Sequence, residues 1–159
     1  MIELRPITEE NMEECVNLDV KEEQQDFIAE NICSLAEAYV AMTSGNTVPM
    51  PYGVYDTETG VMVGFLMLGY CEEGDEDLAE PFYCVWRIMT DANCQEMGYG
   101  KAALEKALEL VKERPLGEAA KFCAAYTADN TAAAGLFAGI GMTAGEADED
   151  GNVLAVMDI

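Results

Sequence analysis

The sequence contains no histidine, only eight lysine and arginine residues, and no pair of cysteines in a Cys-x-x-Cys arrangement. Because protein zinc sites are built mainly from histidine and clustered cysteine ligands, we expect no metal site. No apolar run reaches the ~18 residues that a membrane-spanning helix needs, so we expect no membrane segment. The chain opens with neither a charged leader nor an apolar signal core, which favours a cytoplasmic protein whose six cysteines are reduced thiols.

Acidic residues dominate the charge. The 31 acids against eight bases leave a net charge of −23, which repels phosphate backbones and argues against nucleic-acid binding. An acidic surface attracts cations and therefore favours an amine substrate, although acidic faces often serve only solubility. At 159 residues, half of them hydrophobic, we expect a single domain over residues 1–159 that buries about two-thirds of its unfolded surface.

The most informative segment is D-A-N-C-Q-E-M-G-Y-G-K, residues Asp91–Lys101. Gln95, Gly98 and Gly100 form the pattern Q-x-x-G-x-G, which follows an apolar run over 82–89 and precedes a helical run. A strand, a glycine-rich turn and a helix start direct several backbone N–H groups and the positive end of the helix dipole at one point. That arrangement suits a phosphate. An ordinary strand–helix connection is the alternative.

The spacing excludes two familiar phosphate loops. Gly98 and Gly100 supply half of G-x-G-x-x-G, and Lys101 is followed by alanine rather than by the Ser or Thr of a P-loop. The segment instead resembles motif A of the GCN5-related N-acetyltransferases (GNAT), whose [QR]-x-x-G-x-[GA] loop binds the pyrophosphate of acetyl-CoA. Downstream, N-T-A-A-A-G-L-F-A-G-I-G-M over Asn130–Met142 resembles the family's N-x-x-A-x-x-[LF]-[YF]-x-x-x-G-[FM] segment.

The resemblance implies a mixed α/β (α+β) GNAT fold. In that fold a central, mostly antiparallel sheet of six to seven strands is flanked by four helices and splayed between the fourth and fifth strands. It also implies acetyl-CoA as co-substrate, no metal, and direct attack by an amine in a ternary complex. The partner would be a small-molecule amine, and a homodimer is compatible with this reading.

Periodicity predicts the elements along the chain. We expect a long second helix over 23–42, with Ile28, Ile32, Leu35 and Tyr39 on one face, and then a loop over 43–50. An acidic loop spans 72–80. The other expected helices begin near Thr8, Lys101 and Asn130, and the expected strands are 2–7, 52–55, 61–70, 82–90, 119–126, 142–147 and 153–157.

The resemblance also assigns cofactor roles. The backbone N–H near Ile88 would polarise the thioester carbonyl, an oxyanion-hole role, and the strand end would pair with the pantetheine arm. The Gly-rich loop would hold the pyrophosphate. The expected cofactor-binding residues are Ile88, Met89, Thr90, Gln95, Glu96, Met97, Gly98, Tyr99, Gly100, Lys101, Asn130 and Phe137.

Two positions depart from the family pattern. Many GNAT enzymes carry a glutamate base where this chain has Cys84, and many carry a proton-donating tyrosine where it has Phe137. An alkyl ammonium group has a pKa of about 10.4 and must lose a proton before it attacks. Glu23 is the candidate base, directly or through water, and the lost phenol should slow the reaction rather than stop it.

The front half of the chain and the segment F-Y-C-V-W-R-I-M resemble the bacterial spermine/spermidine acetyltransferase branch. Spermidine or spermine is therefore the expected acceptor. Glu23, Phe27, Tyr39 and Trp86 are candidate acceptor-binding residues, since aromatic faces and a carboxylate suit an ammonium group, although aromatics at such spacing are also typical of a core. Two alternatives remain open: acetylation of a peptide or protein amine, and a CoA-binding module with little catalysis.

Overall fold

The computed structural model describes residues 1–159 as one sheet of seven strands in the order β1-β2-β3-β4-β5-β7-β6. The predicted mixed α/β fold with four helices is confirmed. The strands are β1 (Ile2–Pro6), β2 (Thr47–Asp56), β3 (Met62–Cys71), β4 (Phe82–Thr90), β5 (Lys121–Thr127), β6 (Thr143–Ala144) and β7 (Asn152–Asp158). The helices are α1 (Met12–Asn17), α2 (Asn31–Ser44), α3 (Tyr99–Lys112) and α4 (Thr131–Gly139), and single 3-10 turns occupy Glu22–Gln24 and Ala92–Cys94.

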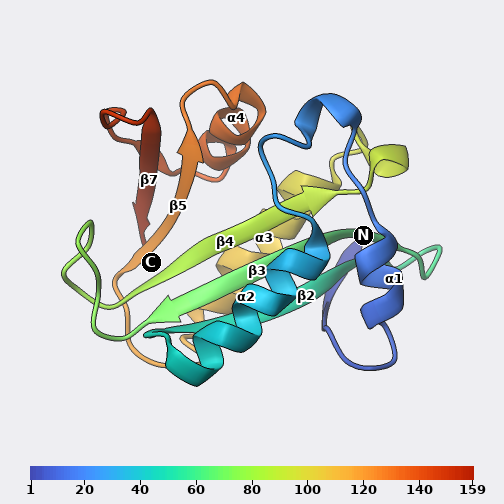
Figure 1. Ribbon diagram of the computed structural model, residues 1–159, viewed down its shortest axis with the longest axis horizontal. Helices are drawn as coiled ribbons and strands as arrows, with labels where there is room; N and C mark the ends of the chain where they lie inside the picture. The colour runs from blue at the N-terminus through green and yellow to red at the C-terminus, as the bar shows by residue number, and fades with distance from the viewer.

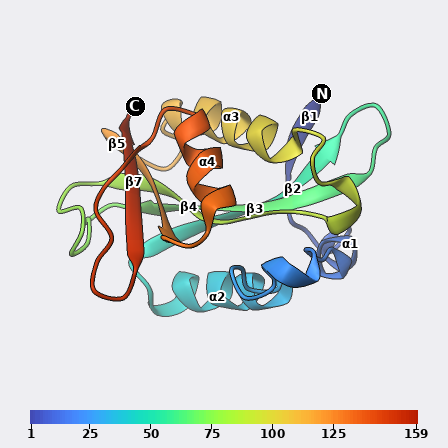
Figure 2. The same ribbon diagram turned by 90° about the horizontal axis from the view of Figure 1, so that it is seen from above.

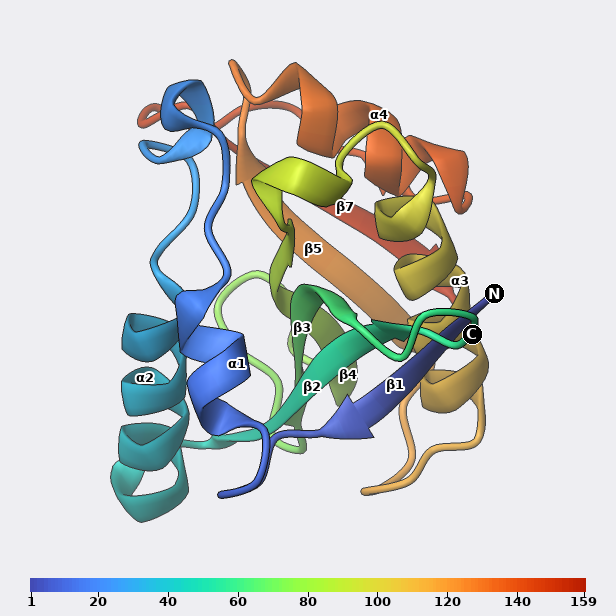
Figure 3. The ribbon, with the colours of Figure 1, turned by 90° about the vertical axis from the view of Figure 1, so that its right-hand side faces the viewer.

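Helices cover both faces of the sheet. α1 and α2 lie on one face and α3 and α4 on the other (Figures 2 and 3). The central strand β3 is buried along its whole length, and its side chains alternate between the two layers. Phe65 and Met67 pack in the cluster that includes α1 and α2 residues, whereas Leu66 and Leu68 pack in the larger cluster that contains Leu104 of α3.

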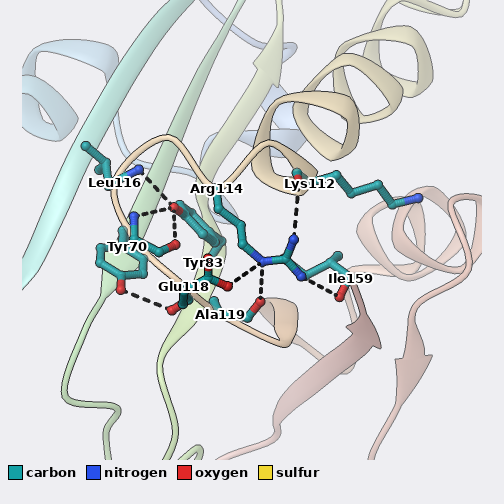
Figure 4. A network of polar contacts seen from close by, with 9 residues as sticks. Tyr70, Tyr83, Lys112, Arg114, Leu116, Glu118, Ala119 and Ile159 are labelled. Atoms are coloured by element: carbon teal, nitrogen blue, oxygen red, sulfur yellow. Dashed lines mark hydrogen bonds and ion pairs between the residues drawn. The ribbon is translucent and has the colours of Figure 1, made fainter.

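All neighbouring strands are antiparallel except β4 and β5, which run parallel. A parallel neighbour needs a crossover, and α3 supplies it. The connection from α3 to β5 is anchored by Tyr83, whose hydroxyl accepts from the N–H of Leu116 at 3.0 Å and of Gly117 at 3.1 Å and donates to the Gly117 carbonyl at 2.9 Å (Figure 4). These bonds hold the start of β5 beside β4.

Arg114 secures the same connection from its other side. Its Nε donates to the Ala119 carbonyl at 3.2 Å and its Nη2 to the Ile159 carbonyl at 3.3 Å (Figure 4). The hydroxyl of Tyr70 donates to the Glu118 carbonyl at 3.1 Å. The segment that leads into β5 is thus tied to β3, to β4 and to the end of the chain.

The prediction of a long helix over 23–42 is wrong at its start. A single 3-10 turn covers Glu22–Gln24, and α2 begins only at Asn31. Ile28, which completed the apolar stripe, packs against the core from an irregular connection. The Asn31 side chain is 3% exposed and donates to the Cys15 carbonyl at 2.8 Å, which helps to fix the helix start at that point.

The remaining boundaries differ less. β2 already begins at Thr47, inside the segment 43–50 that was predicted as a loop, because it pairs with the full length of β3. The two hairpins, around residues 56–61 and 145–151, are present, but β6 is shorter than expected. No helix combines the length and the apolar character needed to cross a membrane.

Candidate functional site

β4 and β5 separate part of the way along their length. Their pairing runs from Phe82↔Lys121 to Val85↔Ala124 and then stops, although β4 continues to Thr90. The register between β3 and β4 shifts at the same place, so that Trp86 is an extra, bulged residue. Figure 1 shows the two strands diverging from their shared end. The expected splay between the fourth and fifth strands is therefore present.

The splay leaves backbone groups of β4 unpaired. Asp91 donates its N–H to the Val63 carbonyl beyond the end of the β3 pairing, at 2.9 Å. Successive residues of a strand direct their N–H and C=O groups to opposite edges. The N–H groups of Ile88 and Thr90 therefore point away from β3, into the gap toward β5.

The Gly-rich loop connects the end of β4 to the N-terminus of α3. Gly98 is the N-cap, with φ of 84°, and no side chain caps this helix end. The first helical bond is made by the Ala102 N–H, which donates to the Gly98 carbonyl at 3.1 Å. The N–H groups of Tyr99, Gly100 and Lys101 precede that bond and have no intrahelical partner. Together with the positive end of the helix dipole they are suited to an anion, as the sequence pattern predicts.

The side chains of this loop divide into anchored and free ones. Gln95 Nε2 donates to the Thr90 carbonyl at 3.1 Å, and Tyr99 donates its hydroxyl to Asp56 Oδ2 at 3.0 Å. Tyr99 thus faces the β2–β3 hairpin and offers the site only its backbone. Met97 is 65% exposed, and the exposed Lys101 ammonium lies 3.8 Å from Glu105. Lys101 is the one cation at this helix start, and its exposed pair with Glu105 contributes little.

The second motif is α4. Asn130 caps this helix by accepting the Ala133 N–H at 3.1 Å, as its position in the motif predicts. Phe137 is only 4% exposed and belongs to the main core, with its ring 5.8 Å from that of Tyr126. A Cβ on Gly100 would lie 3.6 Å from Leu136, so α3 and α4 pack closely beside the loop.

The candidate acceptor residues are not gathered as expected. Because the second helix begins late, Glu23 lies on the 3-10 turn, exposed and without an ion-pair partner. Phe27, in the connection before α2, is 44% exposed, and Tyr39 of α2 is 70% exposed; neither lines either of the two hollows described below. Only Trp86 does. The acceptor-binding roles of Phe27 and Tyr39 therefore stay predictions.

Trp86 forms the floor of a shallow, mostly apolar hollow against α2, together with Cys33, Ala36, Glu37, Val40 and Ala41. The Glu37 carboxylate is bound by Arg87 Nη2 at 2.9 and 3.2 Å, so its charge is already paired. A second, smaller cavity of about 110 Å³ lies between Met89 of β4 and the connection from α1 to α2. Both hollows lie on the α2 face of β4.

Cys84 occupies the strand position where a glutamate base was expected. Burial raises the pKa of its thiol to about 12. At neutral pH Cys84 is therefore a neutral thiol that neither accepts a proton nor attacks as a thiolate. All six cysteines are free thiols, and the structure contains no cluster of three or more potential metal-ligating side chains.

Comparison with known proteins agrees with this geometry. The family described as "Acetyltransferase (GNAT) family" matches residues 7–142. A search of curated protein sequences found no match. Among solved structures, the aminoglycoside acetyltransferase AAC(6')-Ib in complex with ribostamycin and coenzyme A superposes with a TM-score of 0.74 at 14% identity, covering 99% of this chain and 93% of that one.

Two further structures have similar overlap. A GNAT-family acetyltransferase from Streptococcus pneumoniae has a TM-score of 0.69 at 16% identity, covering 100% of this chain and 99% of that one. The ribosomal-protein-S18-alanine N-acetyltransferase from Escherichia coli has a TM-score of 0.64 at 15% identity, covering 100% and 94%. At these identities the structures establish the fold alone.

The family match covers most of the chain and coincides with the splayed strands, the Gly-rich loop and the uncapped helix start. This chain belongs to the GNAT family and is an acetyl-CoA-dependent N-acetyltransferase, which transfers an acetyl group from acetyl-CoA to an amine.

Proposed function

We propose that the acceptor is a primary amine of a small polycation, with spermidine and spermine as the expected substrates, and that the enzyme acts in the cytoplasm. The observation that carries this proposal is a set of acidic side chains from two distant segments, which flank the gap between β4 and β5. The six free thiols support a reducing compartment.

The first acidic segment is the connection between α1 and α2. Its carboxylates are exposed and have no ion-pair partner: Glu22, Glu23, Asp26 and Glu30. The second is the β6–β7 hairpin, where Glu146, Asp148, Glu149 and Asp150 are equally exposed and unpaired. Hydrogen bonds from backbone N–H groups, that of Asn152 foremost, hold the pKa of Asp148 below its usual range, so this carboxylate is charged at neutral pH.

These segments lie on opposite sides of the gap. Figure 1 shows the connection (blue) and the hairpin (dark red) across the splayed ends of β4 and β5. In Figure 2 both extend to the α2 side of the sheet, opposite the face that α3 and α4 cover. A molecule with several ammonium groups gains from carboxylates on both sides, whereas a monoamine meets one.

The chemistry follows from the residues around the gap. In this proposal the N–H groups at the start of α3 bind the pyrophosphate of acetyl-CoA, and the free edge of β4 at Ile88 and Thr90 pairs with the pantetheine arm. A neutral amine attacks the thioester carbon, and the Ile88 N–H stabilises the negative charge that develops on the carbonyl oxygen. The nitrogen's proton passes through water toward a carboxylate, for which Glu23 is the candidate. The C–S bond then breaks, and CoA leaves as a thiolate that water protonates, since Phe137 has no proton to give.

A peptide amine is the second candidate acceptor. One observation favours it: an irregular connection replaces the predicted helix over 23–30, and the α2 face of β5 and β7 is not covered by a helix (Figure 1). An extended peptide fits an open face better than a closed pocket. The acidic surroundings then favour a peptide with several lysines.

An amine panel distinguishes these possibilities. CoA release is measured with spermidine, spermine, butylamine and a lysine-containing peptide, each at several concentrations. The proposal expects kcat/KM for the polyamines to exceed that for butylamine by at least tenfold. A higher value for the peptide supports the second candidate. CoA release that no amine accelerates would indicate a CoA-binding module instead.

A further inference from the structure

The connection between α1 and α2, residues 18–30, contacts the segment that follows β4. The Ala92 N–H donates to the Asp19 carbonyl at 2.7 Å, and the Asp19 N–H donates to Asp91 Oδ2 at 3.2 Å. These two bonds join segments that are more than seventy residues apart in the chain, with a separation of 72 for the second one. They place residues 21–24 over the Gly-rich loop.

Two side-chain contacts then reach the loop itself. Gln95 Nε2 donates to Gln24 Oε1 at 2.6 Å as well as to the Thr90 carbonyl, so both of its hydrogens are used. The Lys21 ammonium lies 3.4 Å from Glu96 Oε1. Gln24 and Lys21 thus hold two successive residues of the cofactor loop. Neither Gln24 nor Lys21 belongs to a recognisable motif.

The residue that they hold in place has a strained backbone. Glu96 has φ of 64°, in the left-handed region that residues with a side chain rarely adopt. Such a conformation costs about 1–3 kcal/mol and persists only where the surroundings impose it. Gln95, which precedes Glu96, donates both side-chain amide hydrogens to hydrogen bonds. The Glu96 carboxylate forms an ion pair with Lys21. Together with the positive φ of Gly98, this conformation shapes the loop in which the N–H groups converge.

We infer that Gln24 is a positioning residue: through Gln95 it keeps the cofactor loop in the conformation that binds the pyrophosphate. The same connection lines the cavity beside Met89, on the face where the acceptor is proposed to enter. Acetyl-CoA binding therefore stabilises the wall of the acceptor site, and by linkage a bound acceptor tightens acetyl-CoA binding. The coupling to the acceptor rests on the proposed function, whereas the positioning of the cofactor loop by Gln24 does not.

The first test measures CoA affinity by calorimetry in the absence of any acceptor. Gln24→Ala should weaken CoA binding by about fivefold, as expected for one hydrogen bond, with an unchanged unfolding midpoint. Gln25→Ala is the matched control, because Gln25 is the exposed neighbour and makes no side-chain bond to the loop; it should leave CoA affinity unchanged. Equal affinity in wild type and Gln24→Ala would overturn the inference.

A double-mutant cycle separates positioning from a general structural role. If Gln24 acts through Gln95, the variant with both Gln24→Ala and Gln95→Ala should bind CoA no more weakly than Gln95→Ala alone. Effects that multiply would mean that Gln24 acts by another route. Neither readout involves an acceptor, so failure of the polyamine proposal leaves this test intact.

Limited proteolysis tests the coupling directly. Lys21 is the only lysine or arginine between Arg5 and Arg87, so trypsin reports on this connection at one bond. Saturating CoA should slow cleavage after Lys21 in the wild type and in Gln25→Ala, and much less in Gln24→Ala. If CoA does not change the wild-type rate, the cofactor does not stabilise the connection and the coupling is refuted.

Discussion

Gly98 is the residue on which we expect cofactor binding to depend most directly. Its φ of 84° is strained for any residue with a side chain, and a Cβ there would meet no protein atom within 4 Å. No protein atom therefore excludes a side chain at position 98. The positive φ disfavours one, and so would the pyrophosphate that we expect the loop to bind. Gly100 differs, because its added Cβ would make ordinary contacts with Leu136 and Thr90.

Gly98→Val should lower CoA affinity by at least tenfold, because it strains the loop and places branches where the pyrophosphate meets the backbone. The control is Gly60→Val in the β2–β3 hairpin, where φ is 73° and nothing lies within 4 Å. It should cause a similar loss of thermal stability and leave calorimetric CoA affinity unchanged. Equal affinity loss in both variants would show that strain alone, and not the phosphate site, is responsible.

Cys84 predicts a dependence of stability on pH. Its thiol pKa is raised to about 12 by burial, whereas an unfolded cysteine ionises near 8.5. As pH rises above about 8.5 the unfolded state loses this proton first, so the free energy of unfolding should fall between pH 9 and about 12. Urea titrations at pH 8 and pH 10.5 measure this fall, and Cys84→Ala should reduce it. An equal fall in the variant would assign the effect to other groups, such as the buried Cys15 and Cys123.

Among the elements, the connection from α3 to β5 determines the geometry of the gap. β5 is held parallel to β4 over only four residue pairs, and Tyr83 fixes the chain just before that pairing begins. The Tyr83 side chain is fully buried. Tyr83, together with Arg114 and Tyr70, thus sets the position of β5 beside the gap from outside it.

Tyr83→Phe should destabilise the protein by about 1–3 kcal/mol, because the Leu116 and Gly117 N–H groups lose a buried acceptor. Tyr70→Phe is the comparison, since Tyr70 donates a single bond to the Glu118 carbonyl and should cost less. Urea denaturation measures both. Equal losses would mean that burial of the rings, not the pair of bonds at Tyr83, anchors the connection.

At the scale of the whole molecule, charge decides how an acceptor approaches. With a net charge of −23, the protein attracts cations from every side, but selectivity requires carboxylates at the site. Exposed ion pairs contribute only about 0–1 kcal/mol each. The two acidic segments beside the gap are therefore expected to matter more than the total charge.

Removing two charges from the hairpin tests this point. Glu146→Gln with Glu149→Gln should raise the spermine KM several-fold, and added salt should raise the wild-type KM, because attraction is screened over about 10 Å at 0.1 M. The control, Glu9→Gln with Glu10→Gln in the turn before α1, removes the same charge far from the gap (Figure 1) and should change KM little. If both double variants raised the spermine KM equally, the hairpin carboxylates would act only through the total charge of the protein.

The geometry of the loop that is expected to bind the cofactor was predictable from local sequence. Gln95, Gly98 and Gly100 are neighbours in the chain, and a strand, a glycine turn and a helix start determine where their N–H groups point. The surroundings of the expected acceptor site were not predictable in the same way. Apolar spacing over residues 28–39 indicated one long helix with Ile28, Ile32, Leu35 and Tyr39 on its packed face. In α2, however, Ile32 is 58% and Tyr39 is 70% exposed, whereas the buried residues are Asn31, Ser34 and Ala38. Apolar spacing alone therefore gave neither the start of this helix nor its packed face.

Other features were decided only by the tertiary structure. No spacing in the sequence relates Gln24 to Gln95, or Lys21 to Glu96, since 71 and 75 residues separate them. The pairing of Glu37 with Arg87 and the raised pKa of Cys84 likewise follow from burial and from neighbours on other elements. Motifs report chemistry carried by consecutive residues, whereas contacts between distant segments exist only after the sheet has brought them together. The sequence by itself thus determined the family and the Gly-rich loop, whereas the fold decided which distant residues contact that loop, because those contacts need the sheet to be formed.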